Sequence, residues 1–316
     1  MFLRLLSIVY FLSSLNAYGQ TPQDASSQVI KSGEKGKNRY EIRVVELPSD
    51  EKKDLLFPLD SEPDTSQYGA VSHYHILPRK GHEAYRIRVT LPPNYSPQKT
   101  YPTVYYLDSW WLSEIVLGTN TLLTQSQRIE PMIFVGVSNT GGFDSWNKQR
   151  LLDFSPSKLT KENTTVVIIL QYPKYMSPKH TGNAASFLDF LENTIISEVE
   201  ANYAVKPGES GVIGHSFSGL FGYYSLQAKP DLFKKYLLIS PSMWWEAAKI
   251  VDDETLEQFS QQTTPHEVFI SYGTDEPPLL TDPIMRLDSF INNKPMEALS
   301  YKLVPYENRN HNSVIP

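Results

Sequence analysis

A serine with small neighbours stands at a predicted corner between a strand and a helix. Residues 211–219 read GVIGHSFSG, and a helix-like stretch continues to residue 228. At such a corner the chain turns so sharply that a serine hydroxyl is lifted clear of the sheet, and only small residues fit two positions on either side. Gly214 and Ser218 meet that demand, in a G-x-S-x-S pattern rather than G-x-S-x-G. A Gly/Ser-rich stretch alone is more often an ordinary turn, but the flanking strand and helix patterns predict that Ser216 is a nucleophile.

A serine nucleophile needs a general base, and at this kind of corner the acid and the histidine follow the serine along the chain. Only His266 and His311 lie downstream of Ser216. His266 begins a predicted strand, whereas Ser216 projects from the opposite edge of the sheet, so roughly 20 Å separates them at about 3.3 Å per residue. The predicted base is therefore His311, in the polar stretch NRNHNS. The other histidines are interpreted as structural or surface groups: His73, His75, His82, His180 and His215.

The acid is expected in the loop after the strand that His266 begins, which reads GTDEP at residues 273–277. A carboxylate there would hold the proton on His311 Nδ1 and leave Nε2 able to accept the serine proton. Asp275 and Glu276 are neighbours whose side chains point different ways, and spacing alone does not choose between them. Two residues further along are weaker alternatives: Asp282 and Asp288.

Composition argues against several other functions. The chain has 316 residues, 40% of them hydrophobic, and 29 basic and 35 acidic residues give a formal net charge of −6. These values suit one large domain, and the charges form no basic stripe of the kind that binds nucleic acid. Cysteine is absent, which excludes disulfides, thiolate metal sites and a cysteine nucleophile. The predicted chemistry needs no metal and no organic cofactor.

The first residues have the pattern of an export signal. Arg4 supplies a positive charge, residues 5–15 form an apolar run, and an AYG cleavage motif precedes residue 20. The apolar run is shorter than the roughly 20 residues that span a bilayer. We therefore expect an exported protein, periplasmic or secreted, without stable membrane insertion. Its expected parts are a signal peptide at 1–19, a flexible leader at 20–39 and a single domain at 40–316.

Strand-like and helix-like stretches alternate along the chain. Strands are predicted at residues 40–47, 71–77, 83–91, 102–107, 132–137, 204–213, 236–240 and 267–272. Helices are predicted at residues 110–123, 184–203, 217–228 and 243–260. The first three strands suit antiparallel edge positions, and the later alternation predicts an α/β fold with a mostly parallel sheet covered by helices on both faces. A β-branched run at 165–170 fits either an inserted edge strand or part of a lid.

Several ordered motifs carry a resemblance to a known family. They are YPTVYYLD at 101–108, FVGVSN at 134–139, RLLDFSP at 150–156, GNAASFL at 182–188, PDLF at 230–233 and SPSMWW at 240–245. Together they span about residues 85–316, and they resemble the putative-esterase family of α/β-hydrolases. That family includes S-formylglutathione hydrolases, mycolyltransferases and enterochelin-type siderophore esterases, and SPSMWW is most similar to the siderophore-esterase branch.

The resemblance implies roles for particular residues. Family members often have G-x-x-E-P after the late strand, which favours Glu276 over Asp275 as the acid. An oxyanion hole is implied from two backbone N–H groups, that of Phe217 and that of Ser109 or Trp110, with Ser109 standing where the family usually has glycine. Backbone donors do not depend on side-chain identity, so the serine does not remove this function.

The resemblance also places three side chains near the pocket: Arg150, Trp245 and Trp110. They would hold an anionic or aromatic part of the substrate, or would be structural. The predicted function is hydrolysis of a small-molecule or carbohydrate ester through an acyl-enzyme, with a siderophore lactone or an acylated carbohydrate as candidate substrates.

Three alternatives to ester hydrolysis stay open: acyl transfer to a sugar or lipid hydroxyl, peptide cleavage, and ligand binding without catalysis. Two features motivate the last alternative. Ser218 stands where the motif usually has glycine, and the sequence ends at Pro316, whereas relatives usually have a helix after the histidine motif.

Overall fold

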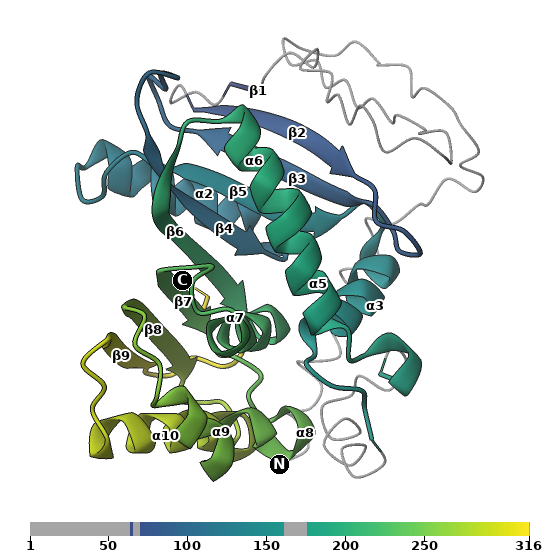
Figure 1. The fold of residues 1–316 in the computed structure, drawn as a ribbon, viewed down its shortest axis with the longest axis vertical. Helices are drawn as coiled ribbons and strands as arrows, with labels where there is room; N and C mark the ends of the chain where they lie inside the picture. Colours follow the sequence, from purple (N-terminus) through teal and green to yellow (C-terminus); the bar gives the residue numbers. More distant parts are fainter. Residues whose placement is uncertain (1–63, 66–69, 161–175, 316) are drawn as a thin grey trace. The chain divides into compact units, whose positions relative to one another are not determined.

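Apolar residues that alternate along successive strands build the central sheet, and Figure 1 shows the helices packed against it. The computed structural model describes residues 64–65, 70–160 and 176–315, all within the unit Phe57–Pro316. Its strands are β1 (Asp64–Thr65), β2 (Val71–Leu77), β3 (Tyr85–Leu91), β4 (Tyr101–Leu107), β5 (Ile133–Asn139), β6 (Val205–His215), β7 (Lys235–Ile239), β8 (His266–Gly273) and β9 (Leu299–Tyr306).

The helices connect these strands. They are α2 (Ser109–Gln125), α3 (Phe143–Phe154), α5 (Ala184–Phe190), α6 (Ser197–Asn202), α7 (Phe217–Ala228), α8 (Trp245–Ala248), α9 (Asp253–Phe259) and α10 (Pro278–Asn293). A π-helical segment, Leu191–Ile196, joins α5 to α6, and short 3₁₀ turns lie at Pro178–His180 and Lys249–Val251.

The sheet is mostly parallel with an antiparallel edge. Within the described residues the strand order is β1-β2-β3-β5-β4-β6-β7-β8-β9. The pairs β1/β2, β2/β3 and β3/β5 are antiparallel, and every pair from β5 to β9 is parallel. This confirms the predicted α/β fold, since parallel strands need long crossover connections and helices supply them.

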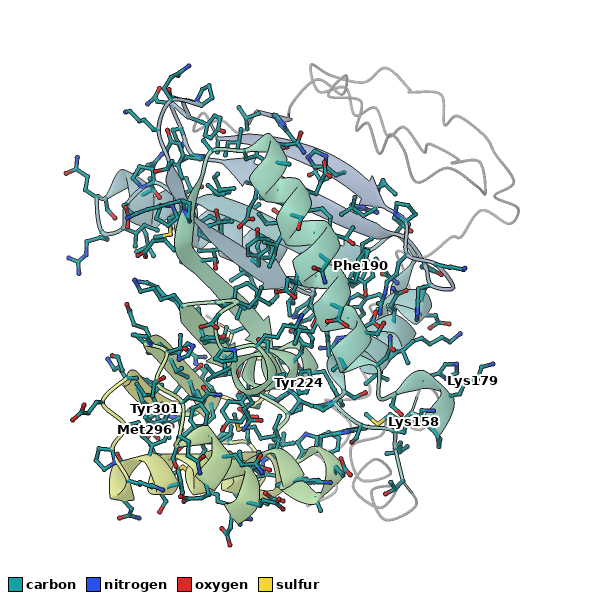
Figure 2. The ribbon with its side chains drawn as sticks, viewed as in Figure 1. Lys158, Lys179, Phe190, Tyr224, Met296 and Tyr301 are labelled. Atoms are coloured by element: carbon teal, nitrogen blue, oxygen red, sulfur yellow. The ribbon has the colours of Figure 1, made fainter. Side chains whose placement is uncertain are left out.

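The two faces of the sheet have separate cores. Tyr105 and Tyr106 point to opposite faces because consecutive strand residues alternate. The Tyr105 face packs against α3, α5, α7, α9 and α10, and Figure 2 shows Phe190 of α5 and Tyr224 of α7 among the side chains around this core. The Tyr106 face packs against α2 and against Val314 and Ile315 near the chain end. Helices therefore cover both faces, as predicted.

Some predicted elements differ from those observed. The helical stretch expected at 243–260 is divided: Glu246, Ala247 and Ala248 have φ of 52°, 53° and 61°, and the side chain of Asp252 caps a separate helix, α9. The sequence analysis also missed α3, α10 and β9. The expected strand at 40–47, the run at 165–170, and the signal peptide and leader lie outside the described residues. Among the helices that are described, none has both the length and the apolar content to cross a bilayer.

A buried carboxylate ties the edge strands to the helical layer. Asp153, at the end of α3, is fully buried and accepts hydrogen bonds from the Tyr85 hydroxyl and from Asn183 Nδ2, the latter at 3.0 Å. Arg79 Nη1 lies 2.8 Å from Asp153 Oδ1, and its guanidinium stacks over Phe187. One carboxylate thus connects β3, α3 and the start of α5.

We predict that Asp153→Ala lowers the free energy of unfolding by about 3–5 kcal/mol, because Arg79 is left buried without its counter-ion. Urea denaturation followed by circular dichroism measures this. The control is Asp253→Ala, which breaks an exposed ion pair with Arg286 and should change stability little. Equal effects of the two substitutions would contradict the role of the buried pair.

Candidate active site

Ser216 occupies a strained corner between β6 and α7. Its φ is 62° and its ψ is −118°, values that non-glycine residues rarely adopt. The corner is fixed by two backbone hydrogen bonds, from Ser216 N to Ile239 O and from Ser242 N to Ser216 O, both 3.0 Å. A Cβ at Gly214 would lie 2.3 Å from Ser218 O, so only glycine fits there. The local sequence therefore forces the serine outward at the carboxyl edge of the sheet.

Ser218, the departure from the usual motif, is accommodated inside the corner. The residue is fully buried. Its Oγ accepts a hydrogen bond from His215 N and donates one to His215 O, each at 2.9 Å. The extra hydroxyl is thus satisfied by the backbone of the corner itself, and no polar group is left unpaired there.

Glu276 and His311 come together from two loops. Glu276 follows β8 and His311 follows β9, the strand that pairs with β8 in parallel. His311 Nδ1 lies 2.8 Å from Glu276 Oε2. A carboxylate only accepts hydrogen bonds, so Nδ1 carries the proton and Nε2 of a neutral ring is left as an acceptor.

The Glu276 carboxylate is held by further donors. Oε1 accepts from the Ser240 hydroxyl and, at 2.7 Å, from Gly273 N. Burial raises the pKa of this carboxyl, but its hydrogen bonds outweigh that effect and leave the pKa below its ordinary value. Asp275, the alternative acid, is exposed. Its contact with the His311 loop is a hydrogen bond from its backbone N–H to Arg309 O at 2.9 Å. Asp282 and Asp288 lie on α10, and the His311 ring is hydrogen-bonded to Glu276 instead.

The His311 loop is anchored at several points. Asn310 Oδ1 accepts from the backbone N–H groups of Asn312 and Ser313, both at 3.1 Å, and Val314 N donates to Asn310 O at 3.0 Å. Val314 is buried against the Tyr106 face of the sheet. These contacts hold the turn that carries the imidazole.

His215, interpreted from the sequence as structural, is part of this arrangement. Its Nε2 lies 2.7 Å from His311 O, and the two rings are tilted by 39° with centroids 4.8 Å apart. Burial and the neighbouring His311 lower the pKa of His215 well below its ordinary value. The ring is therefore neutral and donates its Nε2 proton to the His311 carbonyl. Its position next to Ser216 in the sequence gives no signal of this contact, which depends on the fold.

Ser216 and His311 lie at the same edge of the sheet. Within the described residues, no hydrogen bond joins their side chains. Ser216 Oγ is instead 3.2 Å from Ser242 Oγ. The ring of His311 contacts that of His215, the residue before Ser216. Catalytic hydrogen bonds are often long without substrate and tighten when it binds.

Two helix N-termini meet the same edge. Phe217 is the first residue of α7 and Ser109 is the first residue of α2, so their N–H groups have no acceptor inside their own helices. β4 and β6 pair in parallel with Tyr106 opposite Ile213, which brings the residues after both strands side by side. Free N–H groups at helix N-termini favour an anion placed between them.

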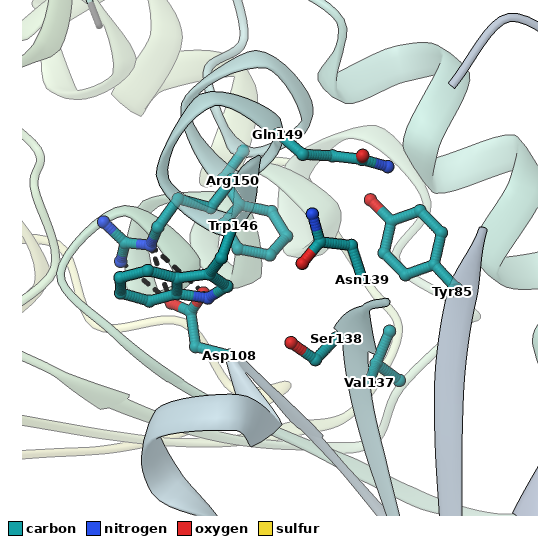
Figure 3. A pocket seen from close by; sticks show the side chains of 9 residues that line it. Tyr85, Asp108, Val137, Ser138, Asn139, Trp146, Gln149 and Arg150 are labelled. Atoms are coloured by element: carbon teal, nitrogen blue, oxygen red, sulfur yellow. Dashed lines mark hydrogen bonds and ion pairs between the residues drawn. The ribbon is translucent and has the colours of Figure 1, made fainter. Parts of the chain in front are cut away.

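Arg150, expected at the pocket, is held in a small site at the end of β4. Its Nη2 lies 2.8 Å from Asp108 Oδ2 and its Nε lies 3.1 Å from Oδ1, as Figure 3 shows. Trp146 Nε1 donates to the same carboxylate at 3.0 Å, and the guanidinium lies over the Trp146 ring, 4.9 Å from its centroid. The guanidinium charge is thus balanced by Asp108, a residue that the sequence analysis did not single out.

The two expected tryptophans have different surroundings. Trp245 is 2% exposed, packs edge-on against Phe217, and donates from Nε1 to Ser157 Oγ at 3.1 Å. Trp110 is 46% exposed and its ring contacts Trp146. Trp245 therefore supports the corner from within the core, whereas Trp110 is open to solvent.

The remaining histidines lie elsewhere. His266 donates from Nε2 to Pro230 O at 2.7 Å at the start of β8, the opposite edge from Ser216. On β2, His73 and His75 contact the Tyr203 hydroxyl, and burial lowers the pKa of His75 to about 4. None of the three shares an edge with Glu276 and His311.

Comparison with known proteins shows the family. The profile of the family described as Putative esterase matches residues 81–314, and the chain belongs to that family. It is similar to the ferri-bacillibactin esterase BesA of Bacillus subtilis (strain 168), at 26% identity over 205 residues, 62% of this chain and 67% of that protein. It is also similar to the siderophore triacetylfusarinine C esterase of Aspergillus fumigatus, at 31% identity over 121 residues, 36% of this chain and 41% of that enzyme.

Solved structures show the same fold. The BES protein from Bacillus cereus superposes with a TM-score of 0.66 at 23% identity, covering 78% of this chain and 92% of that one. The siderophore hydrolase EstA from Aspergillus nidulans superposes with a TM-score of 0.63 at 21% identity, covering 78% and 90%. The fold is that of the α/β-hydrolases, and the family and its esterase relatives support a hydrolase.

Gly273 gives a test of how the acid and base loops fit together. A Cβ there would lie 2.1 Å from Arg309 O, a backbone atom two residues before His311. We predict that Gly273→Ala displaces the His311 loop and lowers ester turnover by about 10²-fold, since shifts near 1 Å cost that much in a reacting site. Initial rates on p-nitrophenyl butyrate measure the effect.

The matched control is Gly118→Ala on α2, where a Cβ meets nothing within 4 Å. It should leave turnover unchanged and add some helix stability. If Gly273→Ala behaves like Gly118→Ala, the close approach of the two loops is not what positions His311.

Proposed function

We propose that the chain is a serine hydrolase of carboxylic esters in which Ser216 is the nucleophile, His311 the general base and Glu276 the acid that orients it. The observation that carries the proposal is the φ of 62° at Ser216, at the same sheet edge as the 2.8 Å contact between His311 and Glu276. A strained serine at a strand-to-helix corner exposes its Oγ above the sheet. Membership of the putative esterase family supports this reading.

In the proposed mechanism His311 Nε2 takes the hydroxyl proton as Ser216 Oγ attacks the ester carbonyl carbon. The tetrahedral intermediate collapses to an acyl-enzyme, and His311 returns the proton to the departing alcohol. Water then attacks the acyl carbon by the same route and releases the carboxylic acid. Glu276 stays ionised and stabilises the imidazolium at each step, which suits its lowered pKa.

The N–H groups of Phe217 and Ser109 are the proposed oxyanion hole. Each is the first residue of its helix, so donors and helix dipoles are both directed at the developing negative charge. Trp110, the second residue of α2, is the alternative donor.

The substrate class is proposed from the relatives. Two of them are named as esterases of siderophores, ferri-bacillibactin and triacetylfusarinine C. We propose a small-molecule ester of that general kind, hydrolysed outside the cytoplasm if residues 1–19 act as the export signal that their sequence resembles.

We expect Ser216→Ala to lower kcat/KM for p-nitrophenyl acetate and butyrate by on the order of 10³-fold or more, because no other group supplies the attacking oxygen. Ser225→Ala is the control, since Ser225 is a buried serine of α7, the helix that follows Ser216, and its hydroxyl donates to Gly222 O at 2.8 Å. Near-normal activity of Ser216→Ala would remove the nucleophile assignment. A wild-type protein inactive on a broad ester panel would favour a binding function instead.

The acid is tested by two neutral substitutions of neighbouring residues. Glu276→Gln should lower kcat by about 10²- to 10⁴-fold, because an amide no longer holds the required His311 tautomer and charge. Asp275→Asn should change kcat less than twofold, since that side chain is exposed. Steady-state kinetics on p-nitrophenyl butyrate compare them, and a larger loss in Asp275→Asn would reverse the assignment.

A further inference from the structure

The residue after β7 lies between the proposed nucleophile and the proposed acid. β7 runs between β6 and β8, the strands that lead to Ser216 and to Glu276. Its last residue, Ile239, accepts a hydrogen bond from Ser216 N at 3.0 Å. The next residue, Ser240, donates from its hydroxyl to Glu276 Oε1 at 2.5 Å. The proposed proton transfer does not use the Ser240 hydroxyl, so that chemistry leaves its role unexplained.

Ser240 holds this position in a strained backbone conformation. Its φ is 40°, in the left-handed region that favours glycine. The residue is 2% exposed, and its N–H donates to Ser271 O of β8 at 2.7 Å. Strained non-glycine residues persist only where the surrounding structure holds them, and they gather at functional sites. The hydroxyl is what a serine provides here and a glycine would not.

The two oxygens of the Glu276 carboxylate have different partners. Oε2 lies 2.8 Å from His311 Nδ1, whereas Oε1 accepts from the Ser240 hydroxyl and, at 2.7 Å, from Gly273 N. At 2.5 Å the Ser240 bond has the length of a charge-assisted hydrogen bond, which is roughly twice as strong as a neutral one. The Glu276 side chain is 1% exposed, so these three donors share its charge.

That sharing bears on the proton of His311. A negative charge beside an imidazole favours the protonated ring. Each donor to Oε1 takes up part of the charge, so the carboxylate holds an imidazolium less strongly. Burial raises the pKa of the Glu276 carboxyl, and hydrogen bonds from His311, Ser240 and Gly273 bring it below its ordinary value. Ser240 is thus one of the groups that stabilise the ionised acid.

The other titratable and charged groups around this pair do not replace that effect. His215 contacts the His311 ring, but burial and His311 itself lower the pKa of His215 well below its ordinary value, so its ring is neutral. Arg150 is paired with Asp108. Asp275 is exposed to solvent, which screens its charge. The charge that His311 meets is therefore mainly that of Glu276, as its donors leave it.

We infer that Ser240 is a positioning residue, one that takes up part of the Glu276 charge and so lets His311 give up its proton at lower pH. The inference rests on the proposed esterase function and adds to it a means of extending hydrolysis toward acidic conditions. Without the hydroxyl, Gly273 N still holds Oε1 at 2.7 Å, so the carboxylate keeps its place beside His311. The expected loss is therefore in the pH range of activity and not in the rate at its optimum.

Ser240→Ala should move the acid limb of the kcat/KM profile to higher pH by about half a unit to one unit, since a hydrogen bond to a charged group stabilises it by an amount of that order. On the plateau above the limb, kcat/KM should change by less than about threefold. Rates on p-nitrophenyl butyrate are measured across the pH range, and the product is read after each sample is brought to one fixed pH. A limb that stays in place or moves to lower pH would overturn the role of Ser240.

Two variants control for the backbone and for burial. Ser240→Gly removes the same hydroxyl but also relieves the strain, since glycine adopts a φ of 40° readily. It should move the limb as far as Ser240→Ala, and unequal movements would assign the effect to the backbone and overturn the inference. Ser271→Ala removes an equally buried hydroxyl on the next strand, one that within the described residues makes no hydrogen bond to Glu276. Its limb should match that of the wild type, and an equal movement there would count against Ser240.

A measurement without turnover separates this inference from the proposed function. The ring C–H signals of the histidines are followed by NMR against pH in the wild type and in Ser240→Ala, and the His311 signal is identified by its loss in His311→Gln. A higher midpoint for the His311 signal in Ser240→Ala supports the inference even if no ester is hydrolysed. Equal midpoints count against it even if the wild type hydrolyses esters fast.

Discussion

The strained backbone of Ser216 is the constraint on which the rest of the site depends. A non-glycine residue at φ 62° and ψ −118° costs about 1–3 kcal/mol, and surrounding structure must hold it. The surrounding structure here is the middle of a parallel sheet: Ile239 at the end of β7 accepts from Ser216 N, and the turn after it donates to Ser216 O from Ser242 N. Neighbouring strands therefore fix the serine, and any change in their register would release it.

Two hydrogen bonds restrain His311, one at its ring and one at its backbone. Glu276 accepts from the ring, and His215 donates to the backbone carbonyl of the same residue. A neutral His215 suits the proposed role of His311, because a second positive charge 4.8 Å from that ring would oppose formation of an imidazolium. The Arg150 charge nearby is balanced by Asp108 for a comparable reason.

The sequence predicted most of the elements whose pattern is local, but missed the helices α3 and α10 and the edge strand β9. The buried runs of β4 to β8 and the corner at Ser216 could be recognised because apolar periodicity and small residues mark them. β9, LSYKLVPY, lies at the sheet edge with half of its residues exposed, and the proline within it weakens the strand pattern. α10 had a readable signal, Leu280, Ile284, Leu287 and Ile291 on one face. The choice between Asp275 and Glu276 depends on burial, which spacing along the chain does not encode.

Ser218 bears on whether the site is suited to catalysis at all. A serine in place of glycine would weaken the corner if its hydroxyl were crowded or unpaired, and that was one motive for expecting a binding protein without activity. Its Oγ instead bridges His215 N and His215 O within the turn, so it adds two hydrogen bonds where glycine has none. The crowded position is Gly214, which the chain retains. The departure from the motif therefore braces the backbone before Ser216, the proposed nucleophile.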